Sequence, residues 1–236
     1  MILVGHQPEY IPYIGFFQKV ARADHFIIVD HVQFARKDFQ NRNYIRNQEG
    51  KLLLTIPVLS KNRFDQPINQ VEIIPSMPWA RKHWRSIYLF YKNAPFFENY
   101  ADELRAVYEK EWVKLSDLTV QLIRLMLKWL DIDVPVSLSS ELRISEKKTQ
   151  MLIEMCRKVG ADTYISGQGA RGYVDPQLLR DAGIHHYLCC FEHPIYPQFH
   201  GRFIPNLSAL DLLFNCGDEA KEILRRCIKA SPLEDK

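Results

Sequence analysis

The chain has 236 residues, 47% of them hydrophobic and 25% charged, which is the composition of an ordinary globular protein and excludes a disordered chain. Its formal net charge of +3 is too small to indicate nucleic-acid binding by itself. Five cysteines show neither a disulfide framework nor zinc-ligand spacing, and no segment has the pattern of a signal peptide or a membrane span. We therefore expect a cytoplasmic protein with reduced cysteines, no structural metal and no membrane span.

Two short apolar segments near the start predict strands that are joined by a helix. Residues 1–5, "MILVG", and 25–30, "HFIIVD", have the strand pattern, and residues 14–24 between them carry apolar side chains on one helical face. Because such β-α-β units are right-handed, the two strands should be parallel neighbours in one sheet.

Polar side chains follow both of these predicted strands. His6 and Gln7 come directly after the first strand, while Asp30 and Gln33 follow the second. A parallel sheet binds its ligand outside the carboxyl ends of its strands, so we expect the two pairs to converge in one crevice.

The middle of the chain has a different pattern. Residues 52–59, "LLLTIPVL", and 68–74, "INQVEII", predict a strand pair. Residues 78–132 have a mainly helical pattern, and Ser116 is a predicted N-cap of their last helix. The apolar side chains of that helix recur at three- and four-residue spacings, as a core-facing stripe of Leu118, Leu122, Leu125 and Trp129.

The α/β pattern then returns and completes the prediction of the fold class. Strands are predicted within residues 134–142, 163–167 and 185–191, and helices within 146–161, 176–184 and 207–227. We predict an α/β protein with a mostly parallel, Rossmann-like sheet flanked by helices. Residues 1–236 should form a single domain, with a central helical insertion at about residues 76–130.

The first candidate site is the group His6, Gln7 and Tyr10 at the end of the first strand. A histidine in this position can transfer a proton or bind a phosphate, and the alternative is a hydrogen-bonded loop histidine. Nucleotidyl transferases that use an HxGH pattern are a weak analogy, because the second histidine is missing here.

The second candidate site is the segment "DHVQFARKDFQNRN", which combines Asp30 and Gln33 with Arg36, Arg42 and Asn43. Guanidinium groups match the geometry of phosphate and carboxylate, and amide side chains suit sugar hydroxyl groups. A solvated loop is the alternative. The mixture of amide and aromatic residues favours a ligand site.

Two later segments add further candidates. In "YISGQGARGYVD", Ser166 and Gly167 follow a predicted strand and Tyr173 enriches the loop beyond what a turn requires. The glycine spacing matches neither a P-loop nor a dinucleotide fingerprint, and turn formation is the alternative. In the segment that begins "HPIYPQFH", Gln198 and Ser208 are placed to line the same crevice from its other side.

Four of these segments together resemble the WbqC-like protein family, from the first residues to about Gly217. They are "HQPEYIPYIGFFQKVARADHFIIVDHVQFARKDFQNRN", "SSEL", "TYISGQGARGYVD" and "YPQFHGRFIPNLSALDLLFN". One departure is Tyr13, where the family commonly has tryptophan. The resemblance highlights as motif positions His6, Gln7, Tyr10, Asp30, Gln33, Arg42, Asn43, Ser166, Gly167, Tyr173, Gln198 and Ser208.

The resemblance implies a bacterial enzyme of O-antigen or other surface-polysaccharide biosynthesis. Our leading hypothesis is a transferase that modifies a nucleotide-activated amino sugar or glycan precursor, by acyl or aminoacyl transfer. His6 would transfer the proton, and Asp30 would assist it. The two arginines, Arg36 and Arg42, would neutralise phosphate, and the remaining motif residues would bind substrate.

Two alternatives remain at the level of sequence. One is a nucleotidyltransferase or ATP-dependent ligase, and the other is a non-catalytic protein that binds a nucleotide or glycan. All three imply a small-molecule partner that carries phosphate, and none implies nucleic acid. The sequence identifies no cofactor.

Overall fold

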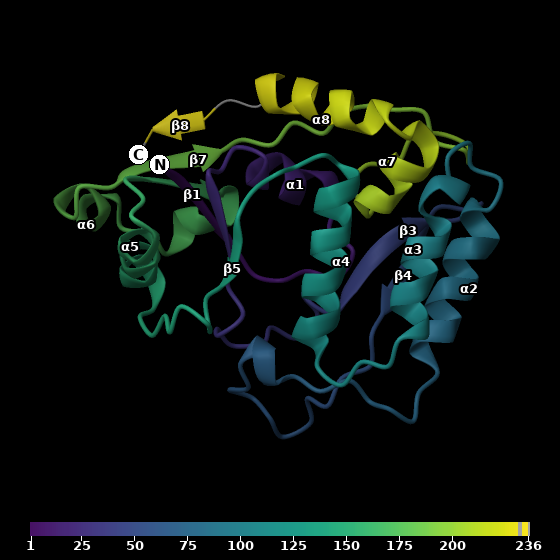
Figure 1. Cartoon of the computed structure of the whole chain (residues 1–236), viewed down its shortest axis with the longest axis horizontal. Helices are drawn as coiled ribbons and strands as arrows, with labels where there is room; N and C mark the ends of the chain where they lie inside the picture. Colours follow the sequence, from purple (N-terminus) through teal and green to yellow (C-terminus); the bar gives the residue numbers. More distant parts are fainter. Residues whose placement is uncertain (231–232, 236) are drawn as a thin grey trace.

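Six strands form one sheet in the computed structural model, which describes residues 1–230 and 233–235 (Figure 1). Their order across the sheet is β5-β2-β1-β6-β7-β8, and only β8 runs antiparallel to its neighbour. The predicted mostly parallel α/β fold is confirmed. The strands are β1 (Ile2–His6), β2 (His25–Ile28), β5 (Val136–Leu138), β6 (Thr163–Gly167), β7 (His185–Cys189) and β8 (Leu233–Asp235).

Helices cover both faces of this sheet because successive strand residues point to opposite sides. Leu3 of β1 belongs to a core shared with α5 (Lys148–Val159) and α6 (Pro176–Asp181). Val4, the next residue, belongs to the larger core on the other face. That core is completed by side chains of α1 (Ile14–Val20), α4 (Leu115–Trp129), α7 (Ala209–Cys216) and α8 (Glu219–Ala230).

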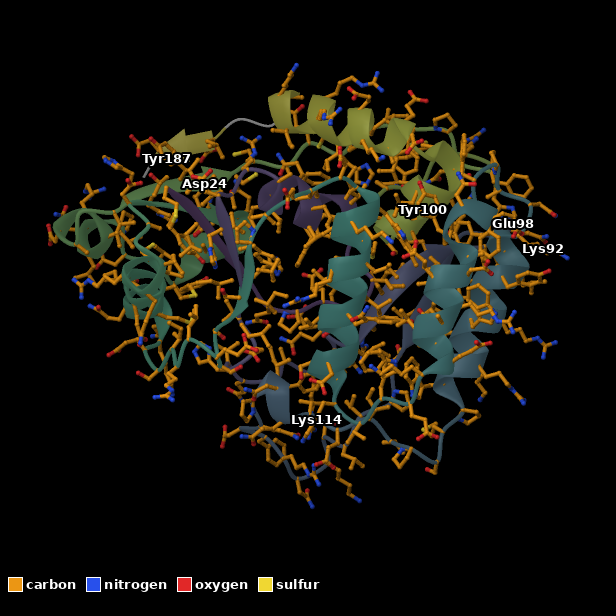
Figure 2. The ribbon with its side chains drawn as sticks, in the orientation of Figure 1. Asp24, Lys92, Glu98, Tyr100, Lys114 and Tyr187 are labelled. Carbon is orange, nitrogen blue, oxygen red and sulfur yellow. The ribbon has the colours of Figure 1, made fainter. Side chains whose placement is uncertain are left out.

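A long segment separates β2 from β5 and contains a hairpin followed by helices. The hairpin pairs β3 (Arg42–Arg46) with β4 (Lys51–Thr55). The other elements of the segment before α4 are the 3₁₀ helix η1 (Ile68–Gln70), α2 (Trp79–Tyr91) and α3 (Glu98–Glu109). The space between these helices and the sheet is filled with side chains (Figure 2), and the larger core extends through it.

The strand pair predicted for residues 52–59 and 68–74 is reduced to one antiparallel bridge, between Val58 and Ile73, whereas β4 pairs along its whole length with the preceding segment. The turn between β3 and β4 is an Asx turn, in which Asn47 Oδ1 accepts hydrogen bonds from the backbone N–H groups of Glu49 and Gly50. This local turn chemistry outweighs the apolar pattern of the later segment, part of which forms η1.

Helix α4 carries its predicted core stripe, but its start differs from the prediction. The helix begins at Leu115 after Lys114, and Ser116 lies buried in the first turn without acting as the cap. The four stripe residues are all buried, as predicted: Leu118, Leu122, Leu125 and Trp129. Within residues 1–230 and 233–235, no helix has the length and apolar character needed to cross a bilayer.

The backbone around Gly217 predicts a large cost for any side chain there. Gly217 has a φ of 54°, and an added β-carbon would lie 2.5 Å from the Phe96 ring. We expect Gly217→Ala to lower the free energy of unfolding by about 3–5 kcal/mol, since backbone strain and overpacking add. Urea unfolding measures this cost.

Gly160 supplies the control for a left-handed glycine without a steric contact, because its φ is 73° and its ψ is 28°, and nothing lies within 4 Å of an added β-carbon. Gly160→Ala should cost about 1–2 kcal/mol, the backbone contribution alone. Equal losses in the two variants would contradict the steric role of Phe96.

Candidate functional site

A cavity of about 410 Å³ opens at the carboxyl ends of β1 and β6. The chain passes from β1 to β2 and β5 on one side, then crosses to β6 and β7 on the other, so the strand order reverses between β1 and β6. Such a switch point is where open α/β sheets bind ligands. The cavity is lined by Gly5, His6 and Gln7 after β1, and by Ser166 and Gly167 of β6.

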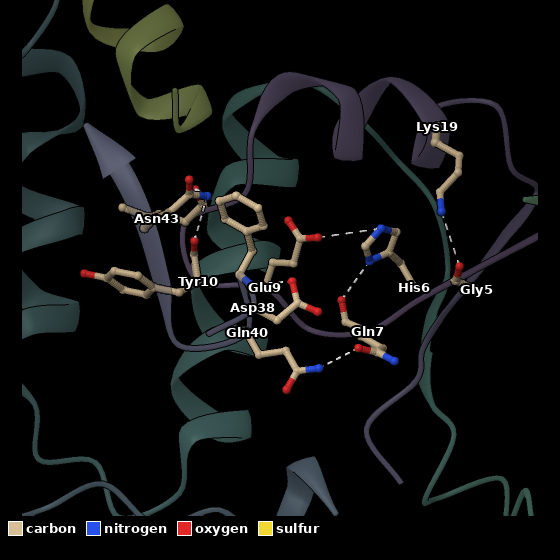
Figure 3. Close-up of polar contacts among 11 residues, drawn as sticks. Gly5, His6, Gln7, Glu9, Tyr10, Lys19, Asp38, Gln40 and Asn43 are labelled. Atoms are coloured by element: carbon tan, nitrogen blue, oxygen red, sulfur yellow. Dashed lines mark hydrogen bonds and ion pairs between the residues drawn. The ribbon is translucent and has the colours of Figure 1, made fainter. Parts of the chain in front are cut away.

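The ring of His6 is held in one orientation at the floor of this cavity. Nδ1 donates a hydrogen bond of 2.9 Å to the backbone oxygen of Gln7, which leaves Nε2 as an acceptor. Nε2 lies 3.8 Å from Oε1 of Glu9 (Figure 3). Burial, and then the charge of Lys19, lower the pKa of His6 from 6.5 to about 3. His6 is therefore neutral at pH 7.

Glu9 is the ionisable group of the cavity that titrates close to neutral pH. Burial raises its pKa from 4.5 to about 7, against the lowering effect of Lys19, and Asp38 raises it further. Asp38 lines the same cavity, and its carboxyl group lies beside Glu9 in Figure 3. Glu9 Oε2 is buried without a hydrogen-bond partner, so Glu9 is free to accept a proton or a hydrogen bond from a ligand.

Lys19 places a buried amine in the cavity. Its Nζ donates a 3.4 Å hydrogen bond to the backbone oxygen of Gly5 and lies 3.8 Å from a β-carbon built on Gly167. Burial lowers the pKa of Lys19 to about 8, while the charges of Glu9 and Cys189 raise it. The ammonium form therefore predominates at pH 7 and provides a positive charge in a partly desolvated site.

The loop that carries Glu9 is held in a strained conformation. Ile11 has a φ of 40°, which is rare for a β-branched residue. The buried amide of Asn43 donates to the backbone oxygens of Tyr10 and Ile11, at 3.1 and 2.9 Å. The Tyr10 hydroxyl bonds to His83 Nδ1 and to the hydroxyl of Tyr108, at 2.8 and 2.5 Å. The hairpin and helices thus hold the loop over the sheet.

Five of the sequence-predicted site residues line the cavity: His6, Gln7, Ser166, Gly167 and Tyr173. Gln7 Oε1 accepts a 2.5 Å hydrogen bond from Gln40 Nε2, and Gln40 in turn accepts from the backbone of Ala35. Ser166 Oγ is 2.9 Å from His186 Nε2. Tyr173 is about half exposed at the rim.

Asp30 does not line the cavity, and the expected convergence of its side chain with His6 does not occur. Its buried carboxylate accepts hydrogen bonds from Ser139 Oγ, Ser140 N and Ser140 Oγ, at 2.9, 2.9 and 2.6 Å. These bonds join the end of β2 to the end of β5. The geometry gives Asp30 a structural role in the sheet.

Gln33, Arg36 and Arg42 also lie outside the cavity. Gln33 donates to the backbone oxygen of Phe64, and Arg36 lies over the Phe64 ring and donates to the backbone of Ser60. Arg42 belongs to β3. The two arginines are therefore not positioned to clamp an anion together with His6.

The remaining predicted residues stabilise loops and a helix. Tyr10 and Asn43 are buried in the loop contacts described above. Gln198 donates to Ile204 O and to Asp211 Oδ1, both at 2.9 Å. Ser208 is the buried N-cap of α7 and accepts from the backbone of Leu210. None of the four lines the cavity.

Sequence reasoning included Gln40 among the amides suited to sugar hydroxyl groups, but it missed the charged residues of the cavity, Glu9, Lys19 and Asp38. One signal for Lys19 was present, because it interrupts an otherwise largely apolar helix whose residues are all buried. Glu9 stands three positions after His6, and this spacing does not predict a contact between side chains outside a helix. In the described ranges, no group of three or more His, Cys, Asp or Glu side chains is arranged to hold a metal ion.

The fold is that of a Rossmann-like α/β protein with a cavity at its switch point. Residues 7–223 match the WbqC-like protein family, and the chain belongs to this family. It is 36% identical over 225 residues to "Uncharacterized protein Rv1507c" of Mycobacterium tuberculosis, a match that covers 94% of this chain and 96% of that protein. No solved structure matches the chain significantly.

The contacts of Asp30 predict a loss of stability when its carboxylate is removed. We expect Asp30→Ala to lower the free energy of unfolding by about 2–4 kcal/mol, since Ser139 Oγ and Ser140 N lose buried partners. The exposed Asp133→Ala should change it by less than about 0.5 kcal/mol. Chemical denaturation of both variants measures the difference, and equal values would contradict the structural role.

The raised pKa of Glu9 predicts a pH-dependent stability difference. Because the pKa is about 7 in the folded protein and 4.5 ordinarily, the folded state keeps a proton that the unfolded chain releases. Stability due to protonated Glu9 is therefore lost as pH rises from 4.5 through 7.

Glu9→Gln cannot ionise, so its stability relative to wild type should increase by about 2–3 kcal/mol between pH 4.5 and 7.5. Urea unfolding at the two pH values measures this change. The exposed Glu141→Gln should show no such increase. A constant difference for Glu9→Gln would contradict the raised pKa.

Proposed function

We propose that this protein is a transferase that moves an acyl or aminoacyl group onto the amine of a nucleotide-activated amino sugar or a related glycan precursor. The observation that carries the proposal is the group of Glu9, His6 and Lys19 in the switch-point cavity. Membership of the WbqC-like family, whose members are associated with surface-polysaccharide gene clusters, supports the substrate class.

Glu9 is the proton acceptor in this proposal, a role that the sequence alone assigned to His6. A carboxylate whose pKa is about 7 is a stronger base than an imidazole whose pKa is about 3. The unpartnered Glu9 Oε2, with Asp38 beside it, attracts the ammonium form of the acceptor. His6 Nε2 is a neutral hydrogen-bond acceptor that orients the amine or the protonated Glu9.

The transfer forms one bond and breaks one bond. The bound ammonium group first loses one proton to solvent. The resulting amine nitrogen attacks the carbonyl carbon of an activated acyl donor, such as an acyl thioester, and its next proton passes to ionised Glu9. The carbon–sulfur bond then breaks, and the leaving thiolate takes the proton back. The Lys19 ammonium group stabilises the negative charge that develops on the carbonyl oxygen.

The sugar part of the acceptor fits the amide and hydroxyl groups of the main cavity. Gln7 and Gln40 provide an ordered amide pair, and Ser166 and Tyr173 provide hydroxyl groups on the opposite side. Arg36 and Arg42 are not used here, because neither lines the cavity.

A binding and turnover screen tests the proposal. Thermal-shift measurements with nucleotide amino sugars, ATP and CTP, with and without Mg²⁺, identify the ligand, because a ligand at a hundredfold its dissociation constant stabilises by about 2.7 kcal/mol. Mass spectrometry then detects the N-acylated product. Stabilisation only by ATP or CTP with Mg²⁺ would support nucleotidyl transfer or ligation instead. Binding of an amino sugar nucleotide without any product would indicate a binding protein.

The pKa values predict a narrow pH optimum for turnover. The rate should rise as Glu9 loses its proton through about pH 7, and fall as Lys19 loses its proton above about pH 8. Glu9→Gln should lower kcat by about 10²–10⁴-fold and abolish the acidic limb of the profile. Steady-state kinetics between pH 5.5 and 9.5 test both effects.

Asp38→Asn is the matched variant, since Asp38 lines the cavity but has no assigned proton transfer. It should raise KM for the acceptor more than it lowers kcat. A normal kcat in Glu9→Gln would overturn the role of Glu9.

A further inference from the structure

A second, smaller cavity adjoins the main one and has no role in the proposal so far. Its volume is about 240 Å³, and it shares His6, Lys19, Gly167 and Gly169 with the main cavity. His6 and Lys19 therefore stand where the two cavities meet. We call the smaller cavity the side chamber; beyond the shared residues it is lined chiefly by Tyr13, Phe16, Gln18, Gln168, Cys189 and Phe191.

Gln18 brings an unused hydrogen-bond donor to the side chamber. Its side chain is fully buried, and its Oε1 accepts a 3.0 Å hydrogen bond from Cys189 Sγ. Its Nε2 is buried without any partner. Because buried amide donors are nearly always paired, this atom indicates that an acceptor oxygen belongs next to it.

The other walls of the side chamber are uncharged and largely aromatic. The rings of Tyr13 and Phe191 pack edge to face, with centroids 5.5 Å apart. Burial raises the pKa of Tyr13 to about 12, so its hydroxyl group is neutral at pH 7. The residues that line the side chamber include no Asp or Glu, and its basic side chains, His6 and Lys19, lie at the junction with the main cavity. An ammonium group placed there would be desolvated without an anionic partner.

We propose that the side chamber binds the acyl part of the donor, as a short uncharged group that carries, besides its reacting carbonyl, an oxygen that accepts a hydrogen bond from Gln18 Nε2. The proposal rests on the transferase function above and selects one of its two options. A glycyl group carries an ammonium group, which donates hydrogen bonds, whereas Gln18 Nε2 needs a hydrogen-bond acceptor. The chamber therefore favours an uncharged acyl group over an aminoacyl group. The reacting carbonyl carbon then lies at the junction, facing Lys19 and the amine in the main cavity.

Alkylation of Cys189 tests the side chamber without any turnover. Iodoacetamide is a short uncharged amide with an acceptor oxygen, and 2-bromoethylamine is a reagent of similar size with an ammonium group. Each forms a carbon–sulfur bond with the thiol and releases halide and a proton. The Cys190→Ser variant removes the adjacent thiol, so that peptide mass spectrometry reports on Cys189 alone. Rates are normalised to those of N-acetylcysteine.

We expect saturable alkylation by iodoacetamide and no saturation with 2-bromoethylamine. Gln18→Met keeps the size of the side chain and removes both the Nε2 donor and the Oε1 that accepts from Cys189 Sγ. Loss of the donor should raise the half-saturating iodoacetamide concentration by about three- to tenfold, the factor of one neutral hydrogen bond, whereas the altered thiol affects the limiting rate. Phe191→Trp, at a partly exposed position, should fill the chamber and slow the reaction. The exposed Gln121→Met should change neither value.

Three results would overturn the proposal: no reaction of Cys189 with iodoacetamide, equal saturation by the ammonium reagent, or an unchanged half-saturating concentration in Gln18→Met. Thermal unfolding of each variant confirms that it is folded. The alkylation result does not depend on catalysis. A normal kcat in Glu9→Gln would contradict the transferase proposal alone. A failed alkylation test would contradict the side-chamber proposal alone, so the two failures are distinguishable.

Discussion

Desolvation at the carboxyl end of β1 is the constraint on which the candidate site depends. β1 lies between β2 and β6 in the sheet, and the ionisable groups around its carboxyl end are buried. Burial disfavours the charged form of each group. It lowers the pKa of His6 and of Lys19, and it raises the pKa of Glu9. One sheet position thus sets the protonation state of three groups.

The charges of these three groups also change one another's pKa values. Lys19 lowers the pKa of Glu9 and of His6, while Glu9 raises the pKa of Lys19. Burial alone would carry Glu9 further toward its neutral form, and the nearby cation opposes this shift. The balance leaves an acid and a base that both change charge within about a unit or two of neutral pH, which is the range that proton transfer requires.

Sequence periodicity and chain order predicted the sheet well because they are local or nearly local signals. The strands around His6 and Ser166 follow from short apolar runs, and their parallel arrangement follows from the helices between them. The partners of Asp30 lie 109 and 110 residues away, and no local pattern indicates them. Lys19 and Glu9 acquire their properties from burial, which arises only when distant segments pack together.

The contacts of the loop with Asn43, His83 and Tyr108 have a consequence for divergence within the family. The sheet supplies the floor of the cavity, whereas the β3–β4 hairpin, α2 and α3 hold the segment that bears Glu9. Substitutions in the hairpin and these helices can therefore move Glu9 and change the shape of the cavity while the sheet stays constant. Family members can differ in this cavity without any change in the residues that line it.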